Sequence, residues 1–351
     1  VGKVKPGFGG CHIGTLGGKE ACVSTYMTLH LSGSNYDLIS STLKLLGSER
    51  KKSLHTHGYF DQYDDFMSHD LSPVSSRKIK QSLLPSNKPR RLLCHDMKGG
   101  YCKDSDEAYR DVFTSWQCID IFCYFSHHFI SIPPKVWVDD CAKNEKVCLG
   151  TLITEGKLGI RNGQKIFQDP ELLAEKLARV CVEFGFHGWL VNFESPVPSS
   201  QHVTKFLRFL TAACKKHIGE NSVVIYYDSL DSRGSVRYQN CLNHVNKPYF
   251  DACDGIFLNY WWNGDMILSS LKLAGTSRRF DVYVGVDVFA RGVKYNAGTG
   301  CAVATSFLQN LGASAAIFAP GWVLECGSGK NKSVDEAKIE DSIFWSMLFK
   351  S

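Results

Sequence analysis

Residues 169–195, DPELLAEKLARVCVEFGFHGWLVNFES, have the pattern of one helix followed by one buried strand. Asp169 is a favourable N-cap, Pro170 suits the first helical position, and Gly185 fits the helix end. Between them, one apolar stripe at helical spacing is formed by Leu173, Leu177, Val180, Cys181 and Phe184. The strand that follows, GWLVNFE, starts as an unbroken apolar run, which is typical of a parallel strand covered on both faces.

Seven further runs resemble this strand, and helical patterns lie between them. The runs are LLCHDM (92–97), IDIFCYFSH (119–127), VCLGTLITE (147–155), VVIYYDS (223–229), GIFLNYWW (255–262), DVYVGVDVF (281–289) and AAIFAPGW (315–322). The clearest of the other helical patterns are HVTKFLRFLTAACKKH and SVDEAKIEDSIFWSMLFK. Eight strands alternating with helices over about 250 residues predict an α/β fold of the (β/α)8 TIM barrel type. A doubly wound open sheet is the alternative, but the Gly-rich phosphate loop expected after its first strand is missing.

The barrel is expected to occupy residues 88–351. Residues 1–87 are Gly-rich at first and then polar, so we expect an irregular N-terminal lead-in there. Length alone does not decide between one large domain and two ordinary ones.

The composition is that of a soluble globular protein, with 44% hydrophobic and 21% charged residues. The net charge of +5 is mild, and the basic clusters at 50–52 and 88–91 lack interleaved aromatic residues, which argues against a nucleic-acid partner. No apolar run approaches the roughly 20 residues of a membrane-spanning helix. The chain starts at Val1, and no signal peptide is visible.

The 14 cysteines form no CxxC pair, which argues against a zinc ribbon or a thioredoxin-type site. Cys94, Cys123 and Cys148 lie in apolar runs, where a free cysteine behaves as a small hydrophobic residue. This usage fits a reducing compartment better than a disulfide framework. The adjacent His127 and His128 suggest a metal, but neighbouring strand residues face opposite ways, so we predict no metal and no cofactor.

Polar and aromatic residues gather where the predicted strands end, and in a (β/α)8 barrel those ends carry the chemistry. The set comprises His95, Asp96, His127, His128, Glu155, Asn192, Glu194, Tyr227, Asp228, Asn259, Tyr260, Trp262, Asp287 and Trp322. Aromatic rings mixed with carboxylates, amides and imidazoles suit a carbohydrate, whose ring faces stack while its hydroxyls need directional partners.

Asn192 and Glu194 stand two residues apart on one strand, so they point the same way. Cleavage of a glycosidic bond needs a proton donor, and most retaining enzymes add a carboxylate nucleophile. An amide is too weak a nucleophile, but it can orient another amide. The pair therefore favours a substrate whose own 2-acetamido group attacks, giving an oxazoline intermediate. The alternative is a buried Asn–Glu pair that only fills the top of the barrel.

GWLVNFE, together with LLCHDMKGGY, WQCIDIFCYFSHHFISIPP, LGTLITE, YYDS, CDGIFLNYWW, VYVGVDVFARG and AIFAPGWV, resembles glycoside hydrolase family 85. The resemblance covers about residues 91–326 and is strongest to the animal cytosolic enzymes. It implies an endo-β-N-acetylglucosaminidase that cuts the diacetylchitobiose core of N-glycans, glycopeptides or glycoproteins, and it implies a cytosolic location. It does not indicate an oligomeric state.

The resemblance also implies roles for individual residues. Glu194 corresponds to the general acid/base, Asn192 to the residue that orients the acetamido group, and Tyr227 to a tyrosine beside that group. Trp262 matches an aromatic position of the sugar-binding rim. Generic substrate contact is expected for Asn259, Asp96, His127, Asp287 and Trp322. Each of these five could equally orient a neighbour or close a hydrogen bond within the barrel.

Four positions depart from the family pattern. His187 replaces the acid of FDGW, Gly156 replaces a tryptophan after TE, Tyr226 stands where tryptophan is usual, and Lys98 where methionine is. The family's β-rich modules after the barrel are also absent from this sequence. The alternative function is therefore a catalytically impaired barrel that binds glycans as a lectin does. Because both Asn192 and Glu194 are retained, hydrolysis is favoured.

Overall fold

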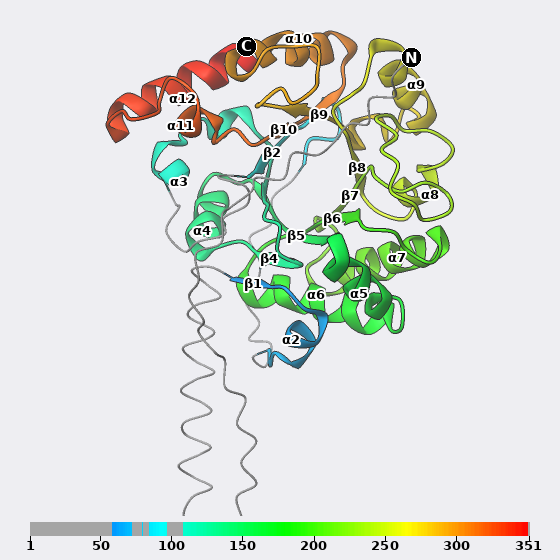
Figure 1. Cartoon of the computed structure of the whole chain (residues 1–351). Coiled ribbons are helices and arrows are strands. Elements are labelled where there is room, and N and C mark those ends of the chain that lie inside the picture. The colour runs from blue at the N-terminus through cyan, green and yellow to red at the C-terminus, as the bar shows by residue number, and fades with distance from the viewer. Residues whose placement is uncertain (1–57, 72–78, 80–83, 97–107, 350–351) are drawn as a thin grey trace, which may run out of the picture. The chain divides into compact units, whose positions relative to one another are not determined.

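A computed structural model describes residues 58–71, 79, 84–96 and 108–349 (Figure 1). Eight parallel strands close into a barrel, because β10 pairs with β2 and β5 pairs with β6. In barrel order they are β2 (Arg91–His95), β3 (Ile121–Tyr124), β5 (Val147–Glu155), β6 (Gly188–Glu194), β7 (Val223–Tyr227), β8 (Gly255–Leu258), β9 (Val282–Asp287) and β10 (Ser314–Phe318). The predicted (β/α)8 barrel is confirmed, and the open doubly wound sheet is wrong.

Helices follow the strands and surround the barrel (Figure 1). They are α3 (Ala108–Val112), α4 (Lys135–Lys143), α5 (Gly156–Ile166), α6 (Pro170–Phe184), α7 (Ser200–His217), α8 (Lys247–Phe250), α9 (Gly264–Ala274), α10 (Ala302–Leu311), α11 (Trp322–Glu325) and α12 (Val334–Leu348). Short 3-10 turns occur at Trp116–Cys118, Arg279–Asp281 and Gly298–Cys301. Within the described part of the chain, none of the helices is long and apolar enough to span a membrane.

The ends of α6 match the sequence prediction. The Asp169 side chain accepts a hydrogen bond from the backbone N–H of Leu172 at 3.0 Å, and Pro170 is the first helical residue. Gly185 ends the helix with φ of 84°, a left-handed conformation that glycine adopts without steric cost.

A short strand and a helix precede the barrel strands. β1 (Gly58–Phe60) pairs antiparallel with β4 (Ile130–Ile132), which pairs antiparallel with β5, and α2 (Tyr63–Ser68) follows β1. These described residues of the expected lead-in are therefore regular in structure, and β4 was not predicted. The rest of the lead-in, the basic cluster at 50–52 and Lys98 lie outside the described residues. The domain boundary at residues 87 and 88 stays a prediction.

The barrel lumen is filled by one cluster of apolar side chains and lined above it by polar ones. The cluster includes Leu92, Cys94, Ile121, Cys123, Leu149, Ile153, Leu190, Ile225, Phe257, Tyr283 and Ala316. Alternate residues such as Trp189, Val191 and Phe193 belong to a second cluster between strands and helices. The two-residue period thus assigns every strand position to the lumen or to the outer layer.

The cysteines follow the same division. Cys94 and Cys123 lie in the lumen cluster and Cys148 in the outer one, all fully buried. The predicted role of these three as small hydrophobic residues is confirmed, and the cysteines of the described residues are free thiols.

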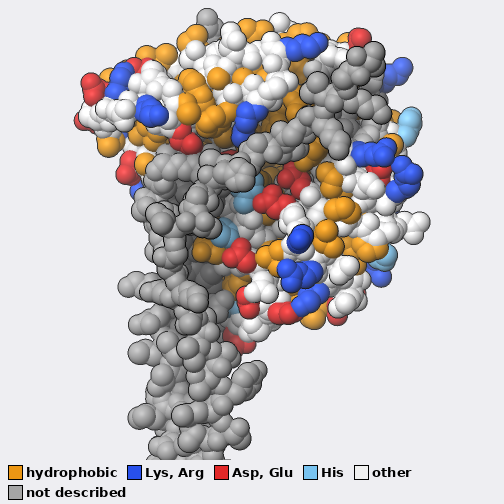
Figure 2. Space-filling model, in the orientation of Figure 1, with side chains coloured by type: hydrophobic (Ala, Val, Ile, Leu, Met, Phe, Trp, Pro, Cys, Tyr) orange, Lys and Arg blue, Asp and Glu red, His pale blue; other side chains and the backbone are white. Residues whose placement is uncertain are grey.

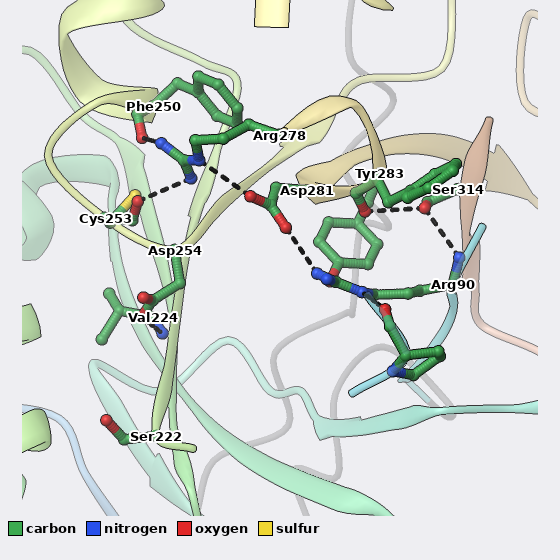
Figure 3. A network of polar contacts seen from close by, with 12 residues as sticks. Arg90, Ser222, Val224, Phe250, Cys253, Asp254, Arg278, Asp281, Tyr283 and Ser314 are labelled. Atoms are coloured by element: carbon green, nitrogen blue, oxygen red, sulfur yellow. Dashed lines mark hydrogen bonds and ion pairs between the residues drawn. The ribbon is translucent and has the colours of Figure 1, made fainter. Parts of the chain in front are cut away.

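A polar network ties together the N-terminal ends of several strands (Figure 3). The Asp281 carboxylate, just before β9, accepts from Arg90 Nη1 at 2.6 Å and from Arg278 Nε at 2.9 Å. Arg278 also donates to the carbonyls of Phe250 and Cys253, both at 2.9 Å. Both arginines are thus paired with the same carboxylate, and the network joins the segments before β2 and β9.

Candidate active site

Asn192 and Glu194 lie side by side at the C-terminal end of β6, above Leu190 on the lumen face. Asn192 is 4% exposed, and within the described part of the chain its Oδ1 has no hydrogen-bond partner. Glu194 is half-buried, and the Tyr238 hydroxyl donates to its Oε1 at 3.3 Å. An unpaired buried acceptor beside a carboxyl group is a position where a ligand can replace the missing partner.

The carboxyl group of Glu155, at the end of β5, is the cross-strand neighbour of Glu194. The parallel register of β5 and β6 places Glu155 opposite Glu194 and Ile153 opposite Asn192. His127 Nδ1 lies 2.9 Å from Glu155 Oε1. Acidic and histidine side chains gather in the middle of the face shown in Figure 2.

The environment of Glu194 favours its protonated form. Burial raises the pKa of Glu194 above its ordinary value, and the negative charge of Glu155 raises it further. Hydrogen bonds from Tyr238 and Asn192 and the charge of His127 lower the pKa, but the net direction is upward. A carboxylic acid that keeps its proton nearer neutral pH can serve as a general acid.

Tyr227 is fixed by a chain of side-chain hydrogen bonds. Its hydroxyl donates to Asn259 Oδ1 at 2.9 Å, and Asn259 Nδ2 donates to Asn240 Oδ1, also at 2.9 Å. Asn240 Oδ1 accepts in addition from the backbone N–H of Trp261 at 3.0 Å. Asn259 therefore orients Tyr227, one of the roles left open by the sequence.

Asp228 holds the long loop after β7 in place. Its carboxylate accepts the backbone N–H groups of Gln239, Asn240 and Asn259 at 2.7 to 3.0 Å. Burial raises the pKa of Asp228 to about 6, against the effect of these bonds. Two of these bonds hold the loop that carries Tyr238 and the third ties Asp228 to the end of β8, so Asp228 acts as the anchor of that loop.

Asp96 and Asp287, at the ends of β2 and β9, are both buried but differ in their partners. Within the described residues Asp96 Oδ1 has none, and burial raises the pKa of Asp96 to about 6. Asp287 accepts from the backbone N–H groups of Phe289 and Arg291 and from Nε and Nη2 of Arg291, both at 2.9 Å. Asp96 keeps capacity for a ligand, whereas Asp287 orders the loop after its strand.

The side chain of Trp262 lies outside the lumen. Its Nε1 donates to the carbonyl of Gly285 at 2.8 Å, and its ring stacks on Phe307 with centroids 6.2 Å apart. It lines an apolar pocket of about 510 Å³ formed by the loops after β8 and β9 and by α10. Its sugar contact, still a prediction, would be made in this pocket.

Trp322 starts α11 and packs against the outer cluster. A Cβ added at Gly298 would lie 2.2 Å from the indole, and one at Gly327 would lie 2.6 Å from it. Gly298 also has φ of 60°, a left-handed conformation. Glycine is therefore required both because a side chain would collide with the indole and because of this backbone conformation. The substrate contact of Trp322 stays a prediction.

Three aromatic residues that the sequence did not single out, Tyr238, Trp261 and Phe318, lie at this end of the barrel beside Tyr260, which it did. Tyr238 contacts Trp261 edge-on with centroids 6.4 Å apart, and Trp261 is 50% exposed. Tyr260 and Phe318, whose centroids are 5.7 Å apart, border the lumen cluster. The doubled tryptophan of NYWW was a signal for Trp261, but nothing local distinguished Tyr238 from other loop tyrosines.

Three departures from the family pattern have structural explanations. His187 precedes β6, at the end opposite Glu194, and its Nδ1 accepts the backbone N–H of Cys148 at 3.1 Å. Tyr226 faces the outer layer, packing on Tyr249 at 4.7 Å. Only Gly156 lies beside the site, and a side chain there would enter open space.

His128 and His95 are directed away from the lumen. His128 Nδ1 lies 2.6 Å from Asp61 Oδ1, and its ring stacks on Tyr59 at 3.5 Å. His95 packs among the rings of Tyr109 and Trp137. The two adjacent histidines thus pair with different carboxylates, but they lie in the bend after β3, so the strand position assumed for them in the sequence analysis is wrong.

A (β/α)8 barrel whose C-terminal end carries a carboxyl group with raised pKa among tyrosines and tryptophans is a glycoside hydrolase. The model for glycosyl hydrolase family 85 matches residues 95–349, and the chain belongs to this family. The resemblance inferred from the sequence is confirmed.

Curated relatives are similar over most of this chain. The cytosolic endo-beta-N-acetylglucosaminidase of Gallus gallus is 40% identical over 81% of this chain and 39% of its own length. That of Danio rerio is 38% identical over 93% of this chain and 45% of its own length. Cytosolic endo-beta-N-acetylglucosaminidase 2 of Arabidopsis thaliana is 36% identical over 86% of this chain and 43% of its own length. The chain thus spans about two fifths of the length of these relatives.

Among solved structures, the glycoside hydrolase domain of Endo-D from Streptococcus pneumoniae R6 has a TM-score of 0.62 and 17% identity, over 82% of this chain and 50% of that one. At this identity the likeness supports the fold alone.

Proposed function

We propose that the chain is the catalytic barrel of an endo-β-N-acetylglucosaminidase that hydrolyses the GlcNAc-β1,4-GlcNAc core of N-glycans. The observation that carries the proposal is the pair on β6: Glu194, whose pKa is raised, and Asn192, whose buried Oδ1 has no partner among the described residues. The names of the relatives support the same activity and a cytosolic location. The substrates are N-glycans, free or on peptides and proteins.

The proposed reaction uses the substrate's own acetamido group. Asn192 Oδ1 accepts the acetamido N–H, which turns the acetamido oxygen toward the anomeric carbon and increases its electron density. That oxygen attacks while Glu194 gives its proton to the leaving glycosidic oxygen, so the C–O bond breaks and an oxazolinium forms. Glu194, now a carboxylate, takes a proton from water as the water opens the ring. The acid is thereby regenerated.

Tyr227 is proposed to lie beside the acetamido group. Its hydroxyl proton is committed to Asn259 at 2.9 Å, so the oxygen presents its lone pairs to the lumen. Asp96 is the proposed partner for a sugar hydroxyl, since its Oδ1 is unpaired among the described residues. Trp262 would contact the glycan away from the scissile bond.

A glycan-binding barrel without turnover is the second candidate. The observation that favours it is the open space at Gly156, where the family pattern has a tryptophan. A pure binding protein, however, has no need of a carboxyl group whose surroundings favour the protonated form. The two candidates differ in one measurement, the release of glycan.

The test is mass spectrometry of a high-mannose glycopeptide incubated with the wild type and with Glu194→Gln. The wild type is expected to leave one GlcNAc on the peptide, and Glu194→Gln to lose about 10²- to 10⁴-fold in rate, the usual contribution of general acid catalysis. Glycan binding should be retained in the variant. Binding without release by the wild type would favour the lectin, and more than a tenth of wild-type turnover in Glu194→Gln would place the acid elsewhere.

A further inference from the structure

Glu155 and Glu194 form a carboxyl pair at the ends of two neighbouring strands. They are direct register partners in the parallel pairing of β5 and β6. Neighbouring strands lie about 4.7–4.9 Å apart, so register partners on one face are adjacent. Two carboxyl groups at such a spacing cannot both ionise without cost, so the surroundings decide which one keeps the proton.

The surroundings of the two carboxyl groups differ. Glu155 is bonded to His127 Nδ1 at 2.9 Å and is about one-third exposed, so it has both a cation and water to stabilise its charge. Glu194 receives a longer bond, 3.3 Å, from the neutral hydroxyl of Tyr238. Glu155 therefore has more partners than Glu194 that stabilise a negative charge, and the surroundings of Glu194 favour its protonated form.

We propose that Glu155 and His127 are positioning residues that set the protonation of Glu194 from opposite sides: the negative charge of Glu155 favours the proton on Glu194, and the positive charge of His127, which bonds Glu155, weakens that effect. The inference rests on the proposed function, since it assigns a purpose to a proton that Glu194 must donate. It gives Glu155, which the sequence placed only among the residues at the strand ends, a definite part in the reaction.

The other groups around the pair have been taken into account. Those that interact electrostatically with Glu194 or His127 are Tyr227, Tyr238 and Tyr260 from the β7 and β8 ends, Asn192 from β6 and Asp96 from β2. The tyrosines are neutral, because burial raises the pKa of each phenol. Glu155 is thus the charge that raises the pKa of Glu194 most, and the hydrogen bond to Glu155 raises the pKa of His127.

The sign of each substitution follows. The active form carries a protonated Glu194, so activity falls at high pH as this proton is lost. Glu155→Gln removes a negative charge and should move that alkaline limb of kcat/KM to lower pH. His127→Gln removes a positive charge and should move the limb to higher pH. A role limited to folding would change the rate at every pH and leave the limb in place.

The experiment measures pH profiles of kcat/KM on a glycopeptide for the wild type and both variants. In parallel, NMR of ¹³C-glutamate-labelled protein follows the Glu194 carboxyl signal, identified by its loss in Glu194→Gln. The matched control is Glu175→Gln, since Glu175 pairs with His217 and Lys216 on the outer helices α6 and α7. Its profile should coincide with that of the wild type.

Opposite shifts for the two variants, in both the limb and the carboxyl titration, would establish the proposal. Shifts in the same direction, or a titration unchanged by Glu155→Gln, would overturn it while leaving Glu194 as the acid. The carboxyl titration does not need turnover. An inactive wild type with the expected opposite titration shifts would therefore reject the proposed function and keep the electrostatic coupling. If Glu155→Gln fails to fold, Glu155→Asp, which keeps the charge, is expected to retain the wild-type limb.

Discussion

The substitution Asn192→Ala separates the formation of the intermediate from its use. Asn192 is 4% exposed, and its Oδ1 has no partner among the described residues, so the alanine variant loses in the free protein only the side-chain hydrogen bond to Glu194. What it loses is the hydrogen bond to the acetamido group as that group becomes charged. Truncation should therefore act on the reaction more than on folding.

The expected size follows from that one bond. A hydrogen bond to a charged group contributes about 1.5–3 kcal/mol. Each 1.36 kcal/mol corresponds to about tenfold in rate, so hydrolysis of the glycan should fall by about 10- to 150-fold.

The assay compares two donors. Glycopeptide hydrolysis requires the oxazoline to form, whereas a synthetic glycan oxazoline supplies it ready-made. The Asn192→Ala variant should hydrolyse the glycopeptide much more slowly than the wild type does, and its rate with the oxazoline should be nearly unchanged. Asn221→Ala, at the opposite end of β7, is the matched control and should leave both rates unchanged. Equal losses with both donors would show that Asn192 is a structural residue and that the oxazoline reasoning is wrong.

Two further predictions concern stereochemistry and stability. Two inversions at the anomeric carbon retain its configuration, so proton NMR within minutes of mixing should detect the β-anomer of the released glycan first; an initial α-anomer would rule out the oxazoline route. Asp281→Asn breaks the bridge to Arg90 and Arg278, whose charged groups are 13–28% exposed. The free energy of unfolding should fall by about 2–3 kcal/mol, which is less than the roughly 3–5 kcal/mol lost when a fully buried pair is broken. The urea midpoint should fall by roughly 1 M. Asp139→Asn breaks the exposed pair with Lys135 and should cost less than about 0.5 kcal/mol; equal midpoints for the two variants would contradict the stabilising role of the network.

Local sequence patterns were sufficient for the architecture and for the central pair. Helix caps such as Asp169 and Gly185 depend on hydrogen bonds within a few residues, and the structure has them as predicted. The two-residue period of a strand also depends only on the backbone, so it placed Asn192 and Glu194 on one face before any tertiary contact was known. Because all eight strands obey that period, Asp96, Glu155, Tyr227 and Asn259 were identified at the rim as well.

Other features depend on contacts between distant parts of the chain. Tyr238 reaches Glu194 because Asp228 holds the loop through backbone N–H groups 11 to 31 residues away. Trp262 turns out of the lumen to meet the carbonyl of Gly285 and the ring of Phe307. Loops lack the regular residue spacing of strands and helices, so the sequence pattern did not predict either of these contacts.

The partners of the charged residues were likewise decided by the tertiary structure. Both Asp96 and Asp287 end a strand, yet only Asp287 is saturated, because Arg291 folds back over it. Glu155 and Glu194 are neighbours only through the register of two strands 39 residues apart in the chain. The sequence determined which residues face the lumen, since that is a local property of each strand. The register and the loops determined which charged groups lie beside each of them, since charge interactions depend on distances between strands.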